Sequence, residues 1–148
     1  VDIATAKTIQ AAAPLQYVGV LRNAKPETIT LPVERLGLHA LQLHGSEDAA
    51  SIHALRPTLP TQCQIWKALP VGAHAPKLDL SDVDRSVLDS EAQGQFGGTG
   101  RTFHWAFLEG LPLDNVFLSG GLNPDNAESA QHLGAAALAF NSVFESAP

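Results

Sequence analysis

Short apolar runs recur along this chain at intervals of roughly 20 to 30 residues, and this interval restricts the fold more than any other feature. The runs cover residues 17–21, 40–43, 64–69, 86–88, 116–118 and 135–140. Each run is too short for a globular helix and is mostly apolar on both faces, which is typical of a buried parallel strand. The interval accommodates one strand, one crossover helix and two loops. The sequence therefore predicts an α/β fold with a parallel sheet and right-handed crossovers.

Helical signals fall between these runs. The predicted helices cover residues 1–13, 33–36, 47–55 and 124–134. Ser46 is a candidate N-cap for the third helix, and Asn123 caps the fourth, which has Pro at its first position. A longer second helix is not expected, because Pro26 and Pro32 interrupt the pattern. Residues 70–84 carry further Pro and Asp residues and are expected to form mostly loop.

The composition is that of a single soluble domain covering residues 1–148, with no linker inside it. No apolar stretch reaches the length of about 18 residues that a membrane span needs. The net charge of −6 argues against a nucleic-acid surface, which needs clustered Lys and Arg. The absence of an export leader and the single Cys favour the cytoplasm. The chain has no Met and stops soon after an apolar run, so we expect it to be a fragment of a longer protein.

Polar residues gather just past the apolar runs, where ligands bind in parallel α/β folds. They are Arg22, Asn23, His44, Gly45, Lys67, Asp89, Ser119, Gly120, Gly121, Asn141 and Ser142. Asp89 directly follows an apolar run, so its partly desolvated carboxyl could hold a proton for general acid catalysis. The alternative for Asp89 is a helix cap or an ion pair with Arg85 or Arg101. His44 is either a ligand contact or a buried, hydrogen-bonded core residue.

The last two predicted strands end in small residues, which suits the binding of an anion. Ser119, Gly120 and Gly121 follow the first of these strands, and Asn141 and Ser142 follow the second. In barrels, the loops after strands seven and eight commonly hold a phosphate by backbone N–H groups. Glycine pairs also occur in ordinary turns, so the pattern alone leaves both interpretations open.

Other residues that are often functional receive structural interpretations here. Cys63 lies at the start of its strand, far from the polar rim, so we interpret it as a residue of the core or of the opposite face of the fold and not as a nucleophile. Trp66 and Trp105 are interpreted as packing residues. His53, His74 and His132 share no ligand-like spacing, so no zinc site is expected. The glycine-rich residues 97–100 either approach a ligand closely or form a flexible connection.

Seven motifs follow one another along the chain. They are Tyr17-Val18-Gly19-Val20, Leu41-Gln42-Leu43-His44-Gly45, Trp66-Lys67-Ala68, Val87-Leu88-Asp89, Gly97-Gly98-Thr99-Gly100-Arg101-Thr102-Phe103, Leu118-Ser119-Gly120-Gly121-Leu122-Asn123-Pro124 and Phe140-Asn141-Ser142. In this order they resemble the phosphoribosylanthranilate isomerase family across almost the whole chain. Residues 11–16 and 138–142 look closest to the isomerase half of the bifunctional enzyme that bacteria fuse to indole-glycerol-phosphate synthase.

The resemblance implies an eight-stranded (β/α)8 TIM barrel, of which this chain would supply strands three to eight and lack the first two strands and the last helix. It also implies an Amadori rearrangement of a phosphosugar, N-(5-phosphoribosyl)anthranilate, in tryptophan biosynthesis, without a cofactor or metal. Asp89 would be the catalytic acid. The phosphate-binding residues would be Ser119, Gly120, Gly121, Asn141 and Ser142, and the substrate would also face His44, Gly97 and Gly98.

The sequence departs from the family pattern in places that matter for catalysis. The family's general base is a Cys in a Lys-x-Cys-Gly motif on strand one; this motif is absent, and Cys63 does not align with it. The Arg that follows strand two in the family is also absent. Ala139 stands where the family usually has Asp, and His104 replaces the Asp of a Phe-Asp-Trp motif. We therefore expect the chain alone to be inactive and, with two unpaired sheet edges, insoluble or molten.

Three hypotheses stay open. The chain is most of an active isomerase, or a catalytically dead phosphate-binding barrel retained as the scaffold of a fused synthase, or a relative that acts on a different phosphosugar. A Lys-x-Cys-Gly strand about 40 residues upstream of Val1 would favour the first hypothesis. Its absence would favour the second.

Overall fold

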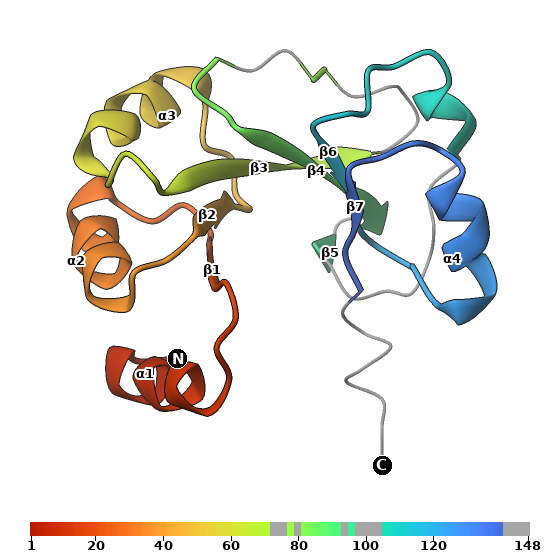
Figure 1. Cartoon of the computed structure of the whole chain (residues 1–148). Coiled ribbons are helices and arrows are strands. Elements are labelled where there is room, and N and C mark those ends of the chain that lie inside the picture. Colours follow the sequence, from red (N-terminus) through yellow and green to blue (C-terminus); the bar gives the residue numbers. More distant parts are fainter. Residues whose placement is uncertain (72–76, 79–80, 93–94, 97–104, 141–148) are drawn as a thin grey trace. The chain divides into compact units, whose positions relative to one another are not determined.

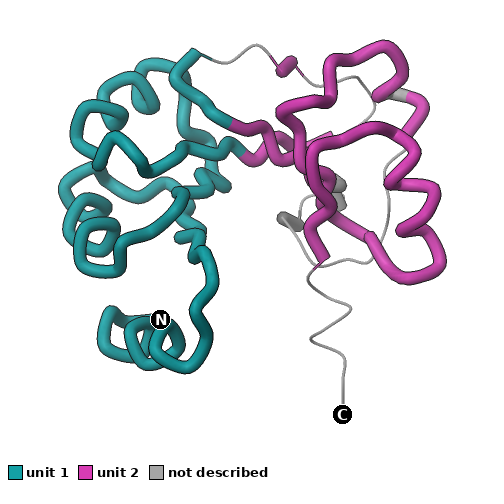
Figure 2. Tube along the Cα trace, in the orientation of Figure 1, with its two compact units in different colours: residues 1–67, 80–84 teal, residues 68–79, 85–148 magenta. Residues whose placement is uncertain are grey.

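The computed structural model describes residues 1–71, 77–78, 81–92, 95–96 and 105–140. The chain divides into two compact units, which Figure 2 shows in different colours. Unit 1 comprises Val1–Lys67 and Leu80–Asp84, and unit 2 comprises Ala68–Asp79 and Arg85–Pro148. Strand β3 (Gln64–Val71) begins in unit 1 and ends in unit 2.

Unit 1 contains three parallel strands and the helices that connect them (Figure 1). Strands β1 (Val18–Leu21) and β2 (Ala40–Leu43) pair in parallel, and β2 pairs in the same way with the first half of β3. Its helices are α1 (Ile3–Ala12), α2 (Pro26–Leu36), α3 (Ala49–Leu55) and the short 3₁₀ helix η1 (Arg56–Thr58).

The core of unit 1 lies between its strands and helices α2 and α3. The buried side chains include Ile29 and Val33 from α2, Ile52 and Leu55 from α3, and Leu41, Leu43 and Ile65 from the strands. Burying one such side chain contributes about 2 kcal/mol. The two helices thus hold the strand ends in place through apolar contacts on one face of the sheet.

Helix α2 is longer than the sequence predicts. It begins at Pro26 and contains Pro32, so the predicted helix over residues 33–36 was too short. Pro26 lies in the first turn, where a missing N–H costs nothing. Pro32 removes one hydrogen bond to the preceding turn, but the burial of Ile29 and Val33 on either side of it compensates for this loss. The helix ends, as predicted, before Gly37, which has a φ of 55°.

The other two helices of unit 1 differ from prediction mainly at their starts. The helix predicted over residues 1–13 is confirmed as α1, and the Asp2 carboxylate caps it by accepting a hydrogen bond from Thr5 N at 2.8 Å. The predicted cap of α3 was wrong. Asp48, not Ser46, caps that helix, accepting from Ser51 N at 2.8 Å, because Ser46 bonds to the turn after β1 instead.

Unit 2 contains a second group of parallel strands. Strand β4 (Arg85–Ala92) pairs in parallel with β6 (Val116–Leu118), which pairs in parallel with β7 (Ala137–Leu138). The two-residue strand β5 (Gln95–Phe96) pairs antiparallel with the end of β4. The core of unit 2 joins these strands to helix α4 (Pro124–Gln131) and to the 3₁₀ helix η2 (Trp105–Leu108), and includes Val71, Leu88, Leu108, Leu113, Val116, Leu118, Leu122 and Ala130.

The start of α4 follows the sequence prediction. The Asn123 side chain accepts from the backbone N–H of Asp125 and of Asn126, and Pro124 occupies the first helical position. The helix ends at Gln131, three residues earlier than predicted. The strand predicted over residues 135–140 is also shorter, because β6 offers register partners only to Ala137 and Leu138.

Each of the six predicted strand runs contains a strand, so the predicted α/β fold with a parallel sheet is confirmed. Hydrogen-bonded neighbours follow the order β1-β2-β3-β4-β6-β7, with β5 beside β4 off this path. In the described ranges, no helix is both long and apolar enough to cross a membrane.

Candidate functional site

Asp89 and Ser119 lie in unit 2 at the point where the parallel pairing of β4 with β6 ends. Leu88 of β4 and Leu118 of β6 are register partners, and Ser119 N donates a hydrogen bond to Leu88 O at 2.7 Å. The residues that come next, Asp89 and Ser119, are therefore adjacent at the carboxyl end of the parallel ladder. Asp89 is 8% exposed. The arrangement puts a buried carboxyl beside the glycine-containing turn that the sequence singles out for an anion.

Strand β4 continues past Asp89, which differs from the sequence prediction. The apolar run was expected to end at Leu88, but the strand extends to Ala92. The reason is a change of partner: β4 pairs in parallel with β6 through Leu88, and its antiparallel pairing with β5 begins at Glu91. Asp89 therefore belongs to a strand and not to a loop or helix cap.

The turn after β6 has a conformation that requires glycine. Gly120 and Gly121 have φ angles of 81° and 67°, in the left-handed region that other residues rarely adopt. Asn126 Nδ2 donates to Gly121 O at 2.9 Å, and Asn126 Oδ1 accepts from Asn123 N at 2.9 Å. The turn is thereby fixed to the N-terminus of α4, where the helix dipole favours a negative charge.

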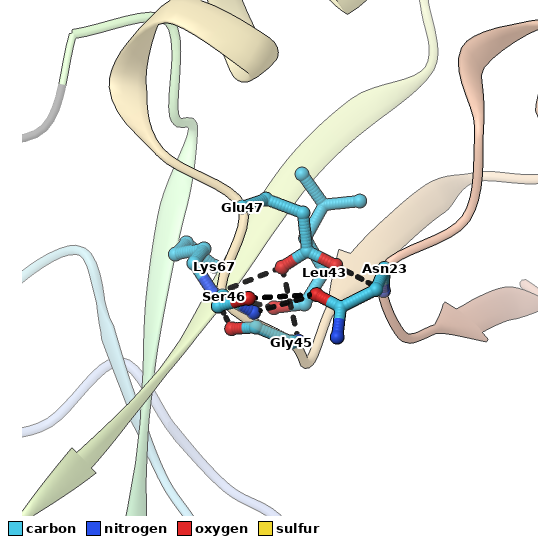
Figure 3. Close-up of polar contacts among 6 residues, drawn as sticks. All are labelled: Asn23, Leu43, Gly45, Ser46, Glu47 and Lys67. Carbon is cyan, nitrogen blue, oxygen red and sulfur yellow. Dashed lines mark hydrogen bonds and ion pairs between the residues drawn. The ribbon is translucent and has the colours of Figure 1, made fainter.

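A buried ammonium group lies in unit 1, at the carboxyl end of the parallel strands (Figure 3). Lys67 is 5% exposed. Its Nζ donates to Gly45 O at 2.7 Å and to Leu43 O at 3.3 Å, and it lies 3.1 Å from Glu47 Oε2. A charge this far from water needs such partners, because an isolated buried charge is very unfavourable.

The Glu47 carboxylate also binds the turn after β2 and connects it to the turn after β1 and to Lys67. Its Oε1 accepts from Asn23 N at 2.7 Å, and its Oε2 accepts from Gly45 N at 2.9 Å as well as from Lys67. Burial by itself would raise the pKa of Glu47, but these hydrogen bonds outweigh it and lower the pKa below its ordinary value. Glu47 is therefore ionised and carries the charge that balances Lys67.

Asn23 connects the turn after β1 to the turn after β2. Its φ is 51°, and its Oδ1 accepts hydrogen bonds from Ser46 N at 2.8 Å and Ser46 Oγ at 3.1 Å. The two turns approach so closely that a Cβ on Gly45 would lie 2.2 Å from Asn23 Oδ1. We call the group of Asn23, Gly45, Ser46, Glu47 and Lys67 the Lys67 cluster.

His44 lies in the middle of this region, directly after β2. It is half-buried, and its backbone N donates to Leu21 O at 2.8 Å. The structure thus places His44 at a strand end, as the sequence predicts, in unit 1. The other predicted substrate contacts, Gly97 and Gly98, lie outside the described residues, as do Asn141 and Ser142.

The sequence interpretation singled out Asn23, Gly45 and Lys67 as polar strand-end residues but missed the part played by Glu47. That residue was predicted as the first residue of a helix over residues 47–55, whereas its carboxylate bonds to the turn after β1 and to Lys67. The sequence did contain a signal for this ion pair. Glu47 follows β2 and Lys67 lies in β3, and these two strands pair in parallel, so the two side chains come to the same edge of the sheet.

The structural interpretations of Cys63 and Trp66 agree with the structure. Cys63 is buried, directly precedes β3, and its pKa is raised by burial, so its thiol is a poor nucleophile. Trp66 donates from Nε1 to Gln64 Oε1 at 2.8 Å and packs edge-on against His39, with ring centroids 6.2 Å apart. Among the residues described, no group of three or more His, Cys, Asp or Glu side chains could hold a metal ion.

Comparison with known sequences identifies close relatives of the chain. The family profile of N-(5'-phosphoribosyl)anthranilate isomerase matches residues 1–147. Tryptophan biosynthesis protein TrpCF of Yersinia pestis is 52% identical over 148 residues, which cover 100% of this chain and 30% of that protein. The protein of the same name from Salmonella typhi is 47% identical over 148 residues, covering 100% of this chain and 32% of its own length. The chain thus spans about a third of the length of these relatives.

Solved structures share the fold. The crystal structure of phosphoribosyl anthranilate isomerase from Thermus thermophilus matches with a TM-score of 0.79 and 28% identity, covering 99% of this chain and 72% of that one. The enzyme from Thermotoga maritima matches with a TM-score of 0.77 and 26% identity, covering 100% and 73% of the two chains. The α/β arrangement described above is therefore similar to theirs over nearly the whole of this chain.

Proposed function

The chain belongs to the N-(5'-phosphoribosyl)anthranilate isomerase family, and from this we propose that the full-length protein performs the family's Amadori rearrangement in tryptophan biosynthesis. The substrate would be N-(5'-phosphoribosyl)anthranilate and the product 1-(2-carboxyphenylamino)-1-deoxyribulose 5-phosphate. No cofactor is required by this chemistry. We also propose that the chain supplies strands three to eight of a (β/α)8 barrel, in a cytoplasmic protein.

The observation that carries this proposal is the adjacency of Asp89 and the glycine turn at one edge of unit 2. In the proposed reaction, Asp89 donates a proton to the ring oxygen of the ribose, and the ring opens to a Schiff base. A base then removes the proton from the neighbouring carbon, and the resulting enolamine tautomerises to the ketone. The ring oxygen and the 5-phosphate belong to one small sugar, so acid and phosphate site must be close together.

The phosphate is assigned to Ser119, Gly120 and Gly121, with Asn141 and Ser142 on the following loop. Backbone N–H groups at a turn without bulky side chains, next to the positive end of α4, suit a phosphate dianion. His44, Gly97 and Gly98 are assigned to the remainder of the substrate. Of these eight residues, Gly97, Gly98, Asn141 and Ser142 lie outside the described residues, so their assignment rests on the sequence pattern and the family resemblance.

This chain alone is proposed to be inactive, because residues 1–148 contain no Lys-x-Cys-Gly motif to supply the base. Its TrpCF relatives are about three times longer than the matched region, and we propose that the chain is joined covalently to an indole-glycerol-phosphate synthase. Ala139, which stands in place of the usual Asp, favours one alternative: a catalytically dead barrel that binds phosphate and serves as a scaffold for the synthase.

The proposal is tested by Asp89→Asn in the full-length protein, which keeps the shape of the side chain but removes its proton. Loss of a general acid is expected to lower turnover of N-(5'-phosphoribosyl)anthranilate by about 10² to 10⁴. Asp84→Asn is the matched control, since Asp84 bonds to Ile65 N and Arg56 and has no proposed catalytic part. Turnover by the Asp89 variant within tenfold of the parent would remove Asp89 from the mechanism, and no turnover by the parent would favour the scaffold.

A further inference from the structure

We propose that Lys67, together with Glu47, is a positioning residue that fixes the place of His44. The inference rests on the proposed function, in which His44 contacts the substrate. It goes beyond that function by assigning a purpose to a buried ion pair that the reaction itself does not use.

The contacts of Lys67 converge on the backbone around His44. Leu43 O and Gly45 O are the carbonyl oxygens directly before and after this residue, and both accept hydrogen bonds from Lys67 Nζ, at 3.3 Å and 2.7 Å (Figure 3). One ammonium group therefore bridges the chain on both sides of His44. Such a bridge restricts the backbone dihedral angles of His44, and thus the direction in which its side chain leaves the turn.

Glu47 and β1 complete this restraint. Gly45 N, in the peptide group after His44, donates to Glu47 Oε2 at 2.9 Å. His44 N, in the peptide group before it, donates to Leu21 O at 2.8 Å. Both polar atoms of the peptide group before His44 are thus bound, and so is the nitrogen of the peptide group after it. The backbone around His44 is therefore held by β1, by β3 and by the loop that carries Glu47.

Net stabilisation alone does not account for this arrangement. Moving two charges out of water costs about as much as their attraction returns, so a buried ion pair is often no better for stability than two apolar side chains. Lys67 and Glu47 are 7% and 10% exposed at their side chains. Burial of this ion pair costs free energy, and its hydrogen bonds lie on both sides of His44. We therefore infer that the pair serves to fix the backbone conformation of His44.

The test is a double-mutant cycle in the full-length protein. Lys67→Met combined with Glu47→Gln removes the restraint without leaving a buried charge unpaired, and His44→Ala removes the side chain that it positions. We expect the pair variant to raise KM by about tenfold to a hundredfold with a much smaller change in kcat, because a displaced binding group costs affinity. In the His44→Ala background the same pair variant should change KM by less than about twofold. Independent, multiplicative effects on KM would overturn the proposal.

Arg56→Met is the matched control, because Arg56 and Asp84 form another ion pair of unit 1 that does not touch the turn carrying His44. This variant is expected to lower stability and leave KM unchanged. A rise in KM equal to that of the pair variant would mean that general loosening, and not the placement of His44, produces the effect.

A second measurement does not depend on turnover. Amide hydrogen exchange at Gly45 and the NMR signals of the His44 ring should change in the pair variant and stay the same in Arg56→Met. If the parent protein shows no isomerase activity, the proposed function fails, but this measurement still decides whether Lys67 and Glu47 position His44. Unchanged exchange and ring signals in a folded pair variant would overturn the inference.

Discussion

Lys67 Nζ lies 3.1 Å from Glu47 Oε2, and neither side chain is more than one-tenth exposed. In this setting each charge depends on the other, since water cannot replace a lost partner. The pair also joins the turn after β2 to strand β3, so its energetic behaviour can be measured directly through folding of the protein.

Removing only one member of the pair should be worse than removing both. Lys67→Met leaves the Glu47 carboxylate buried without its cation and is expected to destabilise the full-length protein by about 3 to 5 kcal/mol. The combined variant Lys67→Met with Glu47→Gln should recover a large part of this loss. Urea denaturation followed by circular dichroism measures both values. Equal destabilisation by the single and combined variants would contradict the structure, because it would mean that the Glu47 carboxylate is not shielded from water.

The contribution of Glu47 to stability should depend on pH in a definite direction. Burial raises the pKa of Glu47, but hydrogen bonds from the backbone N–H groups of Asn23 and of Glu47 itself, together with Lys67, lower it in the folded state below the ordinary value of 4.5. A group with a lowered folded pKa contributes stability above its unfolded pKa and loses it as pH falls through the folded pKa.

The difference in unfolding free energy between parent and Glu47→Gln should therefore be complete near neutral pH and shrink as pH falls below 4.5. Glu34→Gln, on the exposed side of α2, is the control and should show little difference at any pH. A Glu47→Gln difference that stays constant down to acid pH would contradict the assignment.

Gly45→Ala should be strongly destabilising for steric reasons. The added Cβ would lie 2.2 Å from Asn23 Oδ1 and 2.8 Å from Asn23 N, so backbone and not merely a side chain would have to move. We expect a loss of about 3 kcal/mol, at the upper end for overpacking. An added Cβ at Gly110 meets no atom within 4 Å, but the residue has a φ of 76°, so Gly110→Ala measures backbone strain alone, about 1 to 2 kcal/mol. Thermal unfolding of the two variants gives the comparison.

Gly120→Ala should weaken phosphate binding as well as stability. Its φ of 81° and the φ of 79° at Gly134 impose nearly the same strain on an added side chain, about 1 to 2 kcal/mol. Only the first substitution places a methyl group in the turn assigned to the phosphate. Competition by inorganic phosphate against substrate should therefore weaken in Gly120→Ala and stay unchanged in Gly134→Ala. Equal phosphate inhibition constants in both variants would remove the turn from the phosphate site.

Cys63 should be inert in the folded protein. It is 1% exposed and its pKa is raised by burial, so alkylation by iodoacetamide at neutral pH should be slow until the protein unfolds. Peptide mass spectrometry distinguishes this cysteine from any other in the full-length protein. Cys63→Ala should leave turnover unchanged, and a loss of turnover without a loss of stability would contradict the core interpretation.

The parts of the fold that depend on local sequence could be predicted. The spacing of the apolar runs predicts each strand of the parallel ladder, and the Asn123 cap and the Gly37 stop are set by residues next to them. The errors fall where tertiary contacts decide. Pro32 remains helical because its neighbours are buried in the core, and β7 is short because β6 offers it few partners.

In the candidate site, too, the features set by local sequence could be predicted, and those set by tertiary contacts could not. Asp89 and Ser119 could be predicted as neighbours, since residues that end adjacent parallel strands share an edge. The interaction of Glu47 with Lys67 spans 20 residues of sequence and that with Asn23 spans 24, and no local pattern specifies either. Capping statistics favoured Ser46 because they do not include the turn after β1, which takes up its hydrogen-bonding groups.

The change of partner along β4 has a consequence for the proposed role of Asp89 as the acid. The backbone before Asp89 is paired with β6 and the backbone after it with β5, so neither side is free to drift between turnovers. In the proposed reaction, a proton donor anchored in this way would need little reorganisation when the sugar binds, because the entropic cost of aligning it is met during folding. A test of the proposed function by redesign for other substrates should therefore leave the junction of the two ladders intact and vary the turns around it.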